Sequence, residues 1–509
     1  MHNPHLLALT TALTVTLLCW TPGKASQQAT WLTNEPDGSA RELAAAGADG
    51  TLTISESWWS EGEISGEDYG MAVSGAGDLN GDGYDDIAVG APKSSLAVDR
   101  AGAVFVFNGA PQGLAATPSW THGGSKKGDE YGMSVSGAGD LNGDSYDDLA
   151  VGAPLYHSGQ YQSGAAFVFY GSETGLGLAA NWTVISTQQD SEYGYAVAGA
   201  GDVNGDGYDD LLVGARYLSA SETLNGTALL YYGSAGGLST TAGWSYESPQ
   251  AGAGLGMAVA GAGDINNDGC DDIVVGAPLY DKGTSNDGAA YVFLGSETGL
   301  SNTPMELASG WPGALFGYAV SAAGDLDGDG YDDLLVGAPE ADVDVPPDGM
   351  DDGLVMAFFG NEDGIAYYGT GYPLYGPQEK ARFGGAVASL GDLNDDGYDD
   401  FAIGARRYQD DQPYEGGAFI YLGRASWPSD PTTLAPAWAA FGDKADAELG
   451  YAIAGAGDVN SDEYPDLLVG APFYRHDERT ILGRAILYQG GAGGSGGLDF
   501  SIHLPVVLR

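Results

Sequence analysis

Seven short segments of the chain share one spacing of oxygen-bearing side chains. In the first, Asp78–Asp86, aspartate or asparagine stands at positions 1, 3, 5 and 9, and glycine stands at position 6. The first aspartates of successive copies are 62, 62, 62, 61, 67 and 66 residues apart. Oxygen ligands at alternate positions of a tight loop are typical of Ca²⁺, which takes six to eight oxygens in a flexible arrangement.

Each segment offers four side chains and one backbone carbonyl to a metal ion. The side chains are Asp78, Asn80, Asp82 and Asp86; Asp140, Asn142, Asp144 and Asp148; Asp202, Asn204, Asp206 and Asp210; Asp264, Asn266, Asp268 and Asp272; Asp325, Asp327, Asp329 and Asp333; Asp392, Asn394, Asp396 and Asp400; and Asp458, Asn460, Asp462 and Asp466. The position-7 carbonyls belong to Tyr84, Tyr146, Tyr208, Cys270, Tyr331, Tyr398 and Tyr464. Mg²⁺ prefers a stricter octahedron, and Zn²⁺ favours His or Cys side chains. We therefore expect up to seven calcium ions.

Turns without metal are the alternative reading, because Asp, Asn and Gly form turns in any protein. Seven copies of one oxygen spacing favour calcium over plain turns. An EF-hand is excluded, because its position-12 glutamate is replaced by Val89 in the first copy. Position 6 is Ser145 in copy two and Glu463 in copy seven, and copy seven also has Pro465 at position 8. We expect the seventh site to be the weakest.

The segments around each loop predict short strands. In the first repeat these are Tyr69–Gly77 before the loop, Ile87–Pro92 after it, Ala103–Phe107, and a fourth run marked by Trp120. Four strands repeated about every 60 residues cannot bury their faces alone. Radial stacking around an axis solves this, so we expect an all-β, seven-bladed β-propeller of four-stranded blades. The small residues before each loop fit an inner strand near the axis.

The order of motifs in each repeat resembles the FG-GAP repeat of integrin α-subunit propellers. The pairs of an aromatic or leucine residue with glycine are Tyr69-Gly70, Tyr131-Gly132, Tyr193-Gly194, Leu255-Gly256, Phe316-Gly317, Phe383-Gly384 and Leu449-Gly450. Gly-Ala-Pro follows the loop in five repeats, and Gly-Ala-Arg replaces it at Arg216 and Arg406. The resemblance covers residues 51–490 and implies a calcium-binding adhesion propeller. Integrins carry the loop in some blades only, whereas all seven repeats here have it, as in bacterial FG-GAP proteins.

A fourth-strand marker precedes the first repeat, which suggests how the ring closes. The markers are Trp58, Trp120, Trp182, Trp244, Met305, Tyr372 and Trp438. The last repeat supplies only three strands, so we expect Leu52–Trp59 to complete the last blade and remove its open edge. Phe500–Leu508 is the rival strand.

The two ends of the chain read as segments outside the propeller. The apolar stretch Leu6–Trp20 predicts a signal peptide over residues 1–25, and residues 26–50 read as a loosely ordered leader. Cys19 leaves a lipoprotein signal as an alternative. Residues 491–509 read as a Gly/Ser linker with an apolar tail, and we expect no transmembrane span. With the signal removed, Cys270 has no disulfide partner within the chain.

The negative net charge of the chain disfavours some classes of binding partner. The net charge is −52, and the seven loops hold 30 acidic residues, of which seven calcium ions would offset 14 charges. Such acidity disfavours nucleic acid, because phosphate binding requires basic patches. We expect a secreted or cell-surface protein that is monomeric.

Catalytic motifs are missing from the sequence, which favours a non-catalytic module. Four histidines remain beyond the signal, widely scattered, with no zinc motif, nucleophile elbow or phosphate loop. The first functional class is therefore a calcium-stabilised module that binds an extracellular protein or glycan. The second is a carbohydrate-active protein, either a lectin or a calcium-dependent polysaccharide lyase.

Partner contacts are expected on the face opposite the calcium loops. Arg and Tyr gather there in a chain with only 18 Lys and Arg residues, and both are favoured binding anchors. The candidates are Tyr156, His157, Arg216, Tyr217, Tyr280, Arg406, Arg407, Tyr408, Tyr474 and Arg475. Packing around the axial channel is the alternative role of these tyrosines. The extended loops Glu340–Gly353 and Arg407–Gly416 are secondary candidates.

Overall fold

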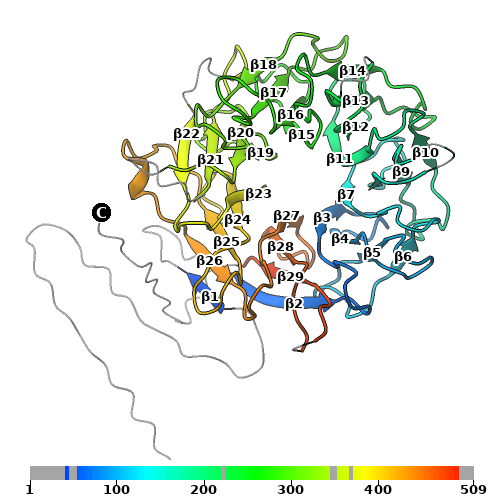
Figure 1. Cartoon of the computed structure of the whole chain (residues 1–509), viewed down its shortest axis with the longest axis horizontal. Coiled ribbons are helices and arrows are strands. Elements are labelled where there is room, and N and C mark those ends of the chain that lie inside the picture. Colours follow the sequence, from blue (N-terminus) through cyan, green and yellow to red (C-terminus); the bar gives the residue numbers. More distant parts are fainter. Residues whose placement is uncertain are drawn as a thin grey trace, which may run out of the picture.

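Seven antiparallel sheets stand around a central axis, in the manner of propeller blades (Figure 1). The structure is a computed structural model that describes residues 41–44, 54–157, 159, 161–220, 224–343, 352–365, 371–477 and 479–491. Within these ranges every regular element is a strand except the short 3-10 helix η1 (Pro431–Thr433). The predicted seven-bladed β-propeller is therefore confirmed.

Each blade is an up-and-down meander of four strands. Blades one and two contain β3 (Ala72–Gly77), β4 (Asp86–Ala91), β5 (Ala103–Phe107) and β6 (Trp120–Gly123), then β7 (Ser134–Gly137), β8 (Leu149–Ala153), β9 (Ala165–Phe169) and β10 (Trp182–Ile185). Blades three and four contain β11 (Tyr193–Gly201), β12 (Asp210–Ala215), β13 (Thr227–Tyr231) and β14 (Trp244–Glu247), then β15 (Ala258–Gly263), β16 (Asp272–Ala277), β17 (Ala289–Phe293) and β18 (Met305–Leu307). Blade five contains β19 (Ala319–Gly324), β20 (Asp333–Ala338), β21 (Leu354–Phe358) and β22 (Tyr372–Tyr375). Blade six contains β23 (Phe383–Gly391), β24 (Asp400–Ala405), β25 (Gly417–Tyr421) and β26 (Trp438–Phe441), and blade seven contains β27 (Ala452–Gly457), β28 (Asp466–Ala471) and β29 (Arg484–Gln489).

Residue size explains the place of each strand in a blade. The first strand of each blade, such as β3 with sequence AVSGAG, lies nearest the axis (Figure 1). Neighbouring inner strands approach closely there, because a Cβ placed on Gly75 would lie 2.5 Å from the carbonyl oxygen of Gly455. The second strand, such as β4, is buried at every residue. The apolar cores lie between neighbouring blades; one joins Val104 and Val106 of blade one to Leu149, Val151 and Phe169 of blade two.

An N-terminal strand closes the ring, as predicted. Strand β2 (Ser55–Glu61) pairs antiparallel with β29 and becomes the fourth strand of blade seven, with Trp59 opposite Ile486. The start of β29 holds β2 by charge, because Arg484 Nη2 donates to Glu61 Oε1 over 2.6 Å. His476 Nδ1 lies 2.9 Å from the other oxygen of Glu61.

A second N-terminal strand lies within the segment expected to be a loose leader. Strand β1 (Arg41–Ala44) pairs antiparallel with β26, from Arg41 opposite Phe441 to Ala44 opposite Trp438, and so adds a fifth strand to blade six. The predicted signal peptide, the rest of the predicted leader, the tail from residue 492 and the rival strand Phe500–Leu508 lie outside the described residues, as does most of the loop Glu340–Gly353. No helix in the described ranges is long and apolar enough to cross a membrane.

Candidate metal centres and partner-binding face

Each predicted metal loop is the hairpin between the first and second strands of a blade. In blade one the position-9 carboxylate, Asp86, is fully buried beneath its loop. Its Oδ2 accepts the N–H of Leu79 over 3.2 Å, and its Oδ1 accepts the N–H of Gly109 over 2.9 Å. All seven position-9 aspartates accept the equivalent pair of N–H groups, at Leu79 and Gly109, Leu141 and Gly171, Val203 and Gly233, Ile265 and Gly295, Leu326 and Gly360, Leu393 and Gly423, and Val459 and Gly490.

Burial raises the pKa of every position-9 carboxyl group. The pKa rises to about 7 for Asp86, Asp210, Asp272 and Asp466, and to about 8 for Asp148, Asp333 and Asp400. Like-charge repulsion raises the pKa further, from the aspartates at positions 1 and 5 in blade one and at positions 1 and 3 in blade five, whereas the two N–H donors lower it. A cation in the loop would favour the ionised form that burial disfavours.

The position-1 aspartate organises the tip of each loop. Asp78 accepts the N–H of Gly81, Asp82 and Gly83 over 2.7, 3.1 and 2.8 Å. The bonds to positions 5 and 6 recur in all seven loops, and so does the bond from the position-7 N–H to the position-5 carboxylate. These bonds hold the carboxylates of positions 1 and 5 close to the backbone of the same short loop.

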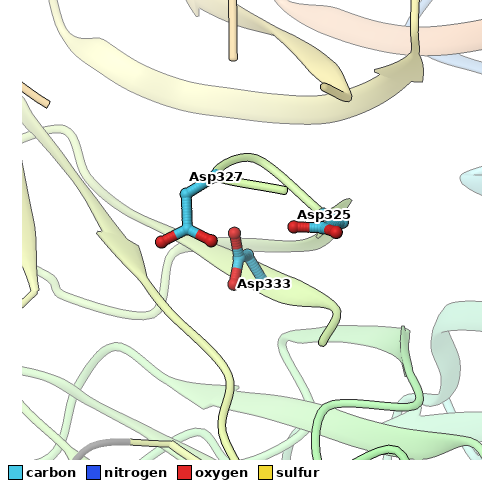
Figure 2. A group of neighbouring side chains, drawn as sticks. All are labelled: Asp325, Asp327 and Asp333. Atoms are coloured by element: carbon cyan, nitrogen blue, oxygen red, sulfur yellow. The ribbon is translucent and has the colours of Figure 1, made fainter. Parts of the chain in front are cut away.

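Blade five brings the most carboxylates together, because it has aspartate at position 3. Asp325, Asp327 and Asp333 each place one oxygen within 4.8 Å of the others, and their side chains converge in Figure 2. Asp327 Oδ1 is buried and has no hydrogen-bond partner among the described residues. Burial, followed by repulsion from Asp329 and Asp325, raises the pKa of Asp327. Converging carboxylate oxygens are the donor set that a hard cation requires.

Position 6 adopts the left-handed backbone conformation even where it is not glycine. Ser145 and Glu463 have φ values of 72° and 74°, close to the 88° of Gly83. Both loops follow the same path as the others, so the bend forms at the cost of local strain. This strain is consistent with a weaker seventh site, which stays a prediction.

Position 8 joins neighbouring blades instead of facing its own loop. Asp147 Oδ2 accepts the N–H of Asp78 in the preceding blade over 2.8 Å, and the Asp147 N–H donates to the Asp78 carbonyl over 3.3 Å. The same two bonds link Asp209 to Asp140, Asp271 to Asp202, Asp332 to Asp264, Asp399 to Asp325, and Asp85 to Asp458. This role was not predicted from the sequence, although aspartate at position 8 recurs in six of the seven copies.

On the opposite face, two arginines lie over tyrosine rings near the axis. The guanidinium of Arg216 is 4.1 Å from the ring centre of Tyr195, and that of Arg406 is 5.0 Å from the ring centre of Tyr451 and 5.9 Å from that of Tyr318. Arg216 Nε also donates to Glu192 over 2.5 Å. Burial raises the pKa of Tyr195 to about 12, although the positive charge of Arg216 lowers it. Side chains of blades three, five, six and seven thus meet around the axis.

Three residues of this axial cluster, Tyr195, Tyr318 and Tyr451, were missed by sequence reasoning. Each directly follows the glycine of an aromatic-Gly or Leu-Gly pair, where blades one, two and four have methionine. That recurring position is the signal that identifies them.

The predicted partner residues divide into two groups. Arg216, Tyr217, Arg406 and Arg407 are partly exposed around the axial cluster. His157 is exposed beside Asp129, and Arg475 is partly exposed beside Asp446. Tyr408 and Tyr474 are only 4% and 5% exposed and belong to the cores between blades. Tyr156 and Tyr280 are partly exposed but pack edge-on against Phe167 and Tyr291. The alternative role in packing therefore fits these four tyrosines better than partner contact.

Comparison with known proteins identifies one repeat family and a group of related chains. The FG-GAP repeat family model matches residues 69–107, 131–169, 193–231, 255–293, 316–367 and 449–493. The chain is 34% identical over 224 residues to integrin alpha-8 of Gallus gallus, covering 43% of this chain and 20% of that protein. It is 34% identical over 184 residues to integrin alpha-5 of Xenopus laevis, covering 33% of this chain and 17% of that protein. The chain spans about a fifth of the length of these relatives.

Proposed function

This chain is an FG-GAP repeat protein with an integrin-α-like β-propeller, and we propose that it is a calcium-stabilised, non-catalytic interaction module that acts outside the cell. The proposal includes secretion through a signal peptide at residues 1–25 and a propeller domain over residues 51–490. The leader at 26–50 and the tail at 491–509 flank this domain. Its relatives are integrin α-subunits, which supports a role in adhesion.

Calcium binding is supported by one observation above all, the seven carboxylates buried beneath the loops. Each has a raised pKa and stands beside other aspartates of its loop, those at positions 1 and 5 in blade one and at positions 1 and 3 in blade five, so the ionised carboxylates repel one another. Asp325, Asp327 and Asp333 each place one oxygen within 4.8 Å of the others, and Asp327 Oδ1 lacks a hydrogen-bond partner among the described residues, which suits a hard cation. A bound ion would neutralise the loop and fix the hairpin, and it would take no part in a reaction. The loops therefore have a structural role, in which each bound ion stabilises the hairpin of its blade.

Calorimetric titration of the full chain with Ca²⁺, after removal of divalent ions, tests this proposal. We expect up to seven ions per chain, with blade five among the tighter sites and blade seven the weakest. Mg²⁺ titrated in parallel should bind more weakly, since the sites offer flexible rings of oxygens. Absence of calcium binding at millimolar concentration would sink the proposal.

Partner binding is assigned to the face opposite the loops. The axial cluster of Tyr195, Arg216, Tyr318, Arg406 and Tyr451 supports this assignment, because Tyr and Arg are favoured anchors and these are partly exposed. The loop face, by contrast, carries 30 acidic residues, most of which are proposed metal ligands. The partner is an extracellular protein or glycan.

A carbohydrate-active protein is the second candidate, because aromatic rings on this face also suit sugars. A glycan array with the full chain, in calcium and in EDTA, separates the candidates. Calcium-dependent capture of a defined set of glycans would favour the lectin, and ultraviolet absorbance of unsaturated products would identify a lyase. Binding to an extracellular protein that is lost in Arg216→Ala and Arg406→Ala, but kept in Arg424→Ala on the loop face, would favour the interaction module.

A further inference from the structure

The first ligand of the first metal loop is held in place by the neighbouring blade. Asp147 of the second loop accepts the N–H of Asp78 at its Oδ2 and donates its own N–H to the Asp78 carbonyl. The two peptide groups on either side of the Asp78 Cα atom are therefore both bonded to blade two. Because the backbone around a residue limits its side-chain rotamers, these bonds also restrict the direction of the Asp78 carboxylate.

The carboxylate that is positioned in this way organises its own loop. Asp78 accepts the N–H groups of Gly81, Asp82 and Gly83 at the loop tip, and it is the first of the predicted calcium ligands. A displacement of Asp78 would therefore move one ligand and loosen the loop tip at the same time. Blade two thus acts on the metal site of blade one without contributing a predicted ligand to it.

A glycine before the loop leaves the space that the neighbouring carboxylate fills. Gly77 has a φ of 66°, and a Cβ atom placed on it would lie 2.1 Å from Asp147 Oδ2. The same overlap with a position-8 carboxylate occurs at Gly77, Gly139, Gly201, Gly263, Gly324 and Gly457. The glycine before one loop and the position-8 aspartate of the next loop are therefore complementary at six junctions.

Loop six lacks this support from its neighbour. The seventh loop has Pro465 at position 8, which offers neither a carboxylate nor an N–H group. A Cβ atom placed on Gly391, which precedes Asp392, would lie 3.6 Å from the nearest atom of Pro465. Asp392 still accepts the N–H groups of Asp396 and Gly397 at its own loop tip. Loop six is therefore built like the others but is not held by the next blade through these two bonds.

On the basis of the calcium binding proposed above, we infer that each position-8 aspartate is a positioning residue for the calcium site of the preceding blade. The positioning aspartates and the position-1 ligands that they hold are Asp147 and Asp78, Asp209 and Asp140, Asp271 and Asp202, Asp332 and Asp264, Asp399 and Asp325, and Asp85 and Asp458.

This arrangement couples neighbouring calcium sites. Asp147 lies between Tyr146, whose carbonyl is a predicted ligand, and the predicted ligand Asp148 of its own loop. An ion in loop two therefore orders Asp147 and favours binding in loop one, and by linkage the effect is reciprocal. The six links join the loops in the order seven, one, two, three, four, five and six, and no such link joins loop six to loop seven.

Amide hydrogen exchange of the full chain at a series of free calcium concentrations tests the inference. Peptides that cover each loop give its midpoint, the calcium concentration at which half of its protection is reached. Asp147→Ala removes the acceptor of the Asp78 N–H, so the midpoint of loop one should rise about tenfold while those of loops four to six stay unchanged. Asp147→Asn removes the charge but keeps an acceptor oxygen, so it should leave the loop-one midpoint near the wild-type value.

A gain of binding in loop six provides the reverse experiment, which a folding defect cannot imitate. Pro465→Asn supplies an N–H group and an acceptor oxygen for Asp392 without added charge, so the midpoint of loop six should fall about tenfold. Gly77→Ala and Gly391→Ala are a matched pair, since both place alanine at a positive φ, 66° and 71°, and only the first displaces a carboxylate. The first should therefore raise the midpoint of its loop more than the second.

The possible results separate this inference from calcium binding itself. A loop-one midpoint that is unchanged in Asp147→Ala, or shifted equally in Asp147→Asn, would overturn the positioning role and leave calcium binding intact. An unchanged loop-six midpoint in Pro465→Asn would do the same. Wild-type loops whose exchange does not respond to calcium would overturn both proposals.

Discussion

The aspartates at positions 5 and 9 of each loop differ in burial and in their role. The position-9 residue, such as Asp333, is fully buried and accepts one backbone N–H group at each carboxylate oxygen. The position-5 residue, such as Asp329, is exposed at the loop tip and accepts one N–H from Tyr331. The first supports the fold directly, whereas the second is mainly available to a cation.

Substitutions at these two positions should separate stability from metal affinity. Asp333→Ala leaves two buried N–H groups unsatisfied, so it should cost roughly 2–5 kcal/mol of unfolding free energy both in calcium and in EDTA. Asp329→Asn keeps an acceptor for Tyr331, so it should lower calcium affinity with little change in EDTA. Urea unfolding under both conditions measures each effect. If both variants lost the same unfolding free energy in EDTA, the two positions would not differ in role as described.

Glu415 gives the molecule a pH dependence away from the metal loops. It is 1% exposed, accepts the N–H groups of Asp410, Asp411 and Gln412, and burial raises its pKa to about 7. Because the folded pKa lies above the ordinary value of 4.5, its contribution to stability is full below pH 4.5 and is lost as the pH rises through 7.

Glu415→Gln should therefore flatten the pH profile of stability. The difference from the wild type should change by on the order of 2–3 kcal/mol between pH 4.5 and 8, in favour of the variant at the upper end. Chemical unfolding at a series of pH values measures it. The exposed Glu297→Gln serves as control and should leave the profile unchanged. A Glu415→Gln profile parallel to the wild type would show that this group does not titrate as described.

At the scale of the strands, three outer-strand tryptophans, Trp58, Trp120 and Trp182, each donate a hydrogen bond to the next blade. The Trp120 indole reaches the Gly177 carbonyl, but the equivalent Trp244 indole is buried without an acceptor among the described residues. Both rings pack edge-on against a phenylalanine, Phe169 and Phe293 respectively. The two positions therefore differ mainly in the hydrogen bond.

Replacement of these tryptophans by phenylalanine should measure that bond. Trp120→Phe should lose about 1 kcal/mol more than Trp244→Phe, because only the first variant leaves a carbonyl without its donor. Thermal unfolding in excess calcium gives the comparison. If Trp244→Phe is the more destabilising change, the indole bond is not what joins the blades.

Some strands of the structure could be predicted from sequence patterns, and others could not. The loop spacing, the small residues of the inner strands and the register of Trp58 predict the blades and the closing strand β2, because each follows from a local repeat. Strand β1 escaped prediction because its four residues match no repeat and depend on the free edge of β26. The position-8 bonds escaped for a related reason, since they join residues about 70 positions apart. Tyr408 and Tyr474 appeared as binding candidates because sequence does not reveal which side of a turn is buried.

At the scale of the whole molecule, acidic charge is concentrated on one face. The loops contribute 30 acidic residues to a chain of net charge −52, and they all face the same way around the ring. Without cations this crowding opposes folding through mutual repulsion.

Removal of calcium should therefore lower the melting temperature, and monovalent salt should restore part of the loss. Calorimetry in EDTA at low and at high sodium chloride measures both effects, because screening weakens repulsion between exposed carboxylates. The calcium-loaded protein should respond far less to salt. An EDTA-treated chain that melts at the same temperature as the loaded chain would contradict a structural role for the ions.

Closure by β2 also sets the order of events during synthesis. Ser57 of β2 bonds to Leu487 of β29, a residue 430 positions later. At roughly 5–20 residues per second, a ribosome needs about 20–90 s to produce that partner. Throughout this interval the strand that carries Trp58 and Trp59 has no sheet to join, and such an edge invites pairing with other chains. The nascent protein is thus most exposed to aggregation just before its last blade emerges.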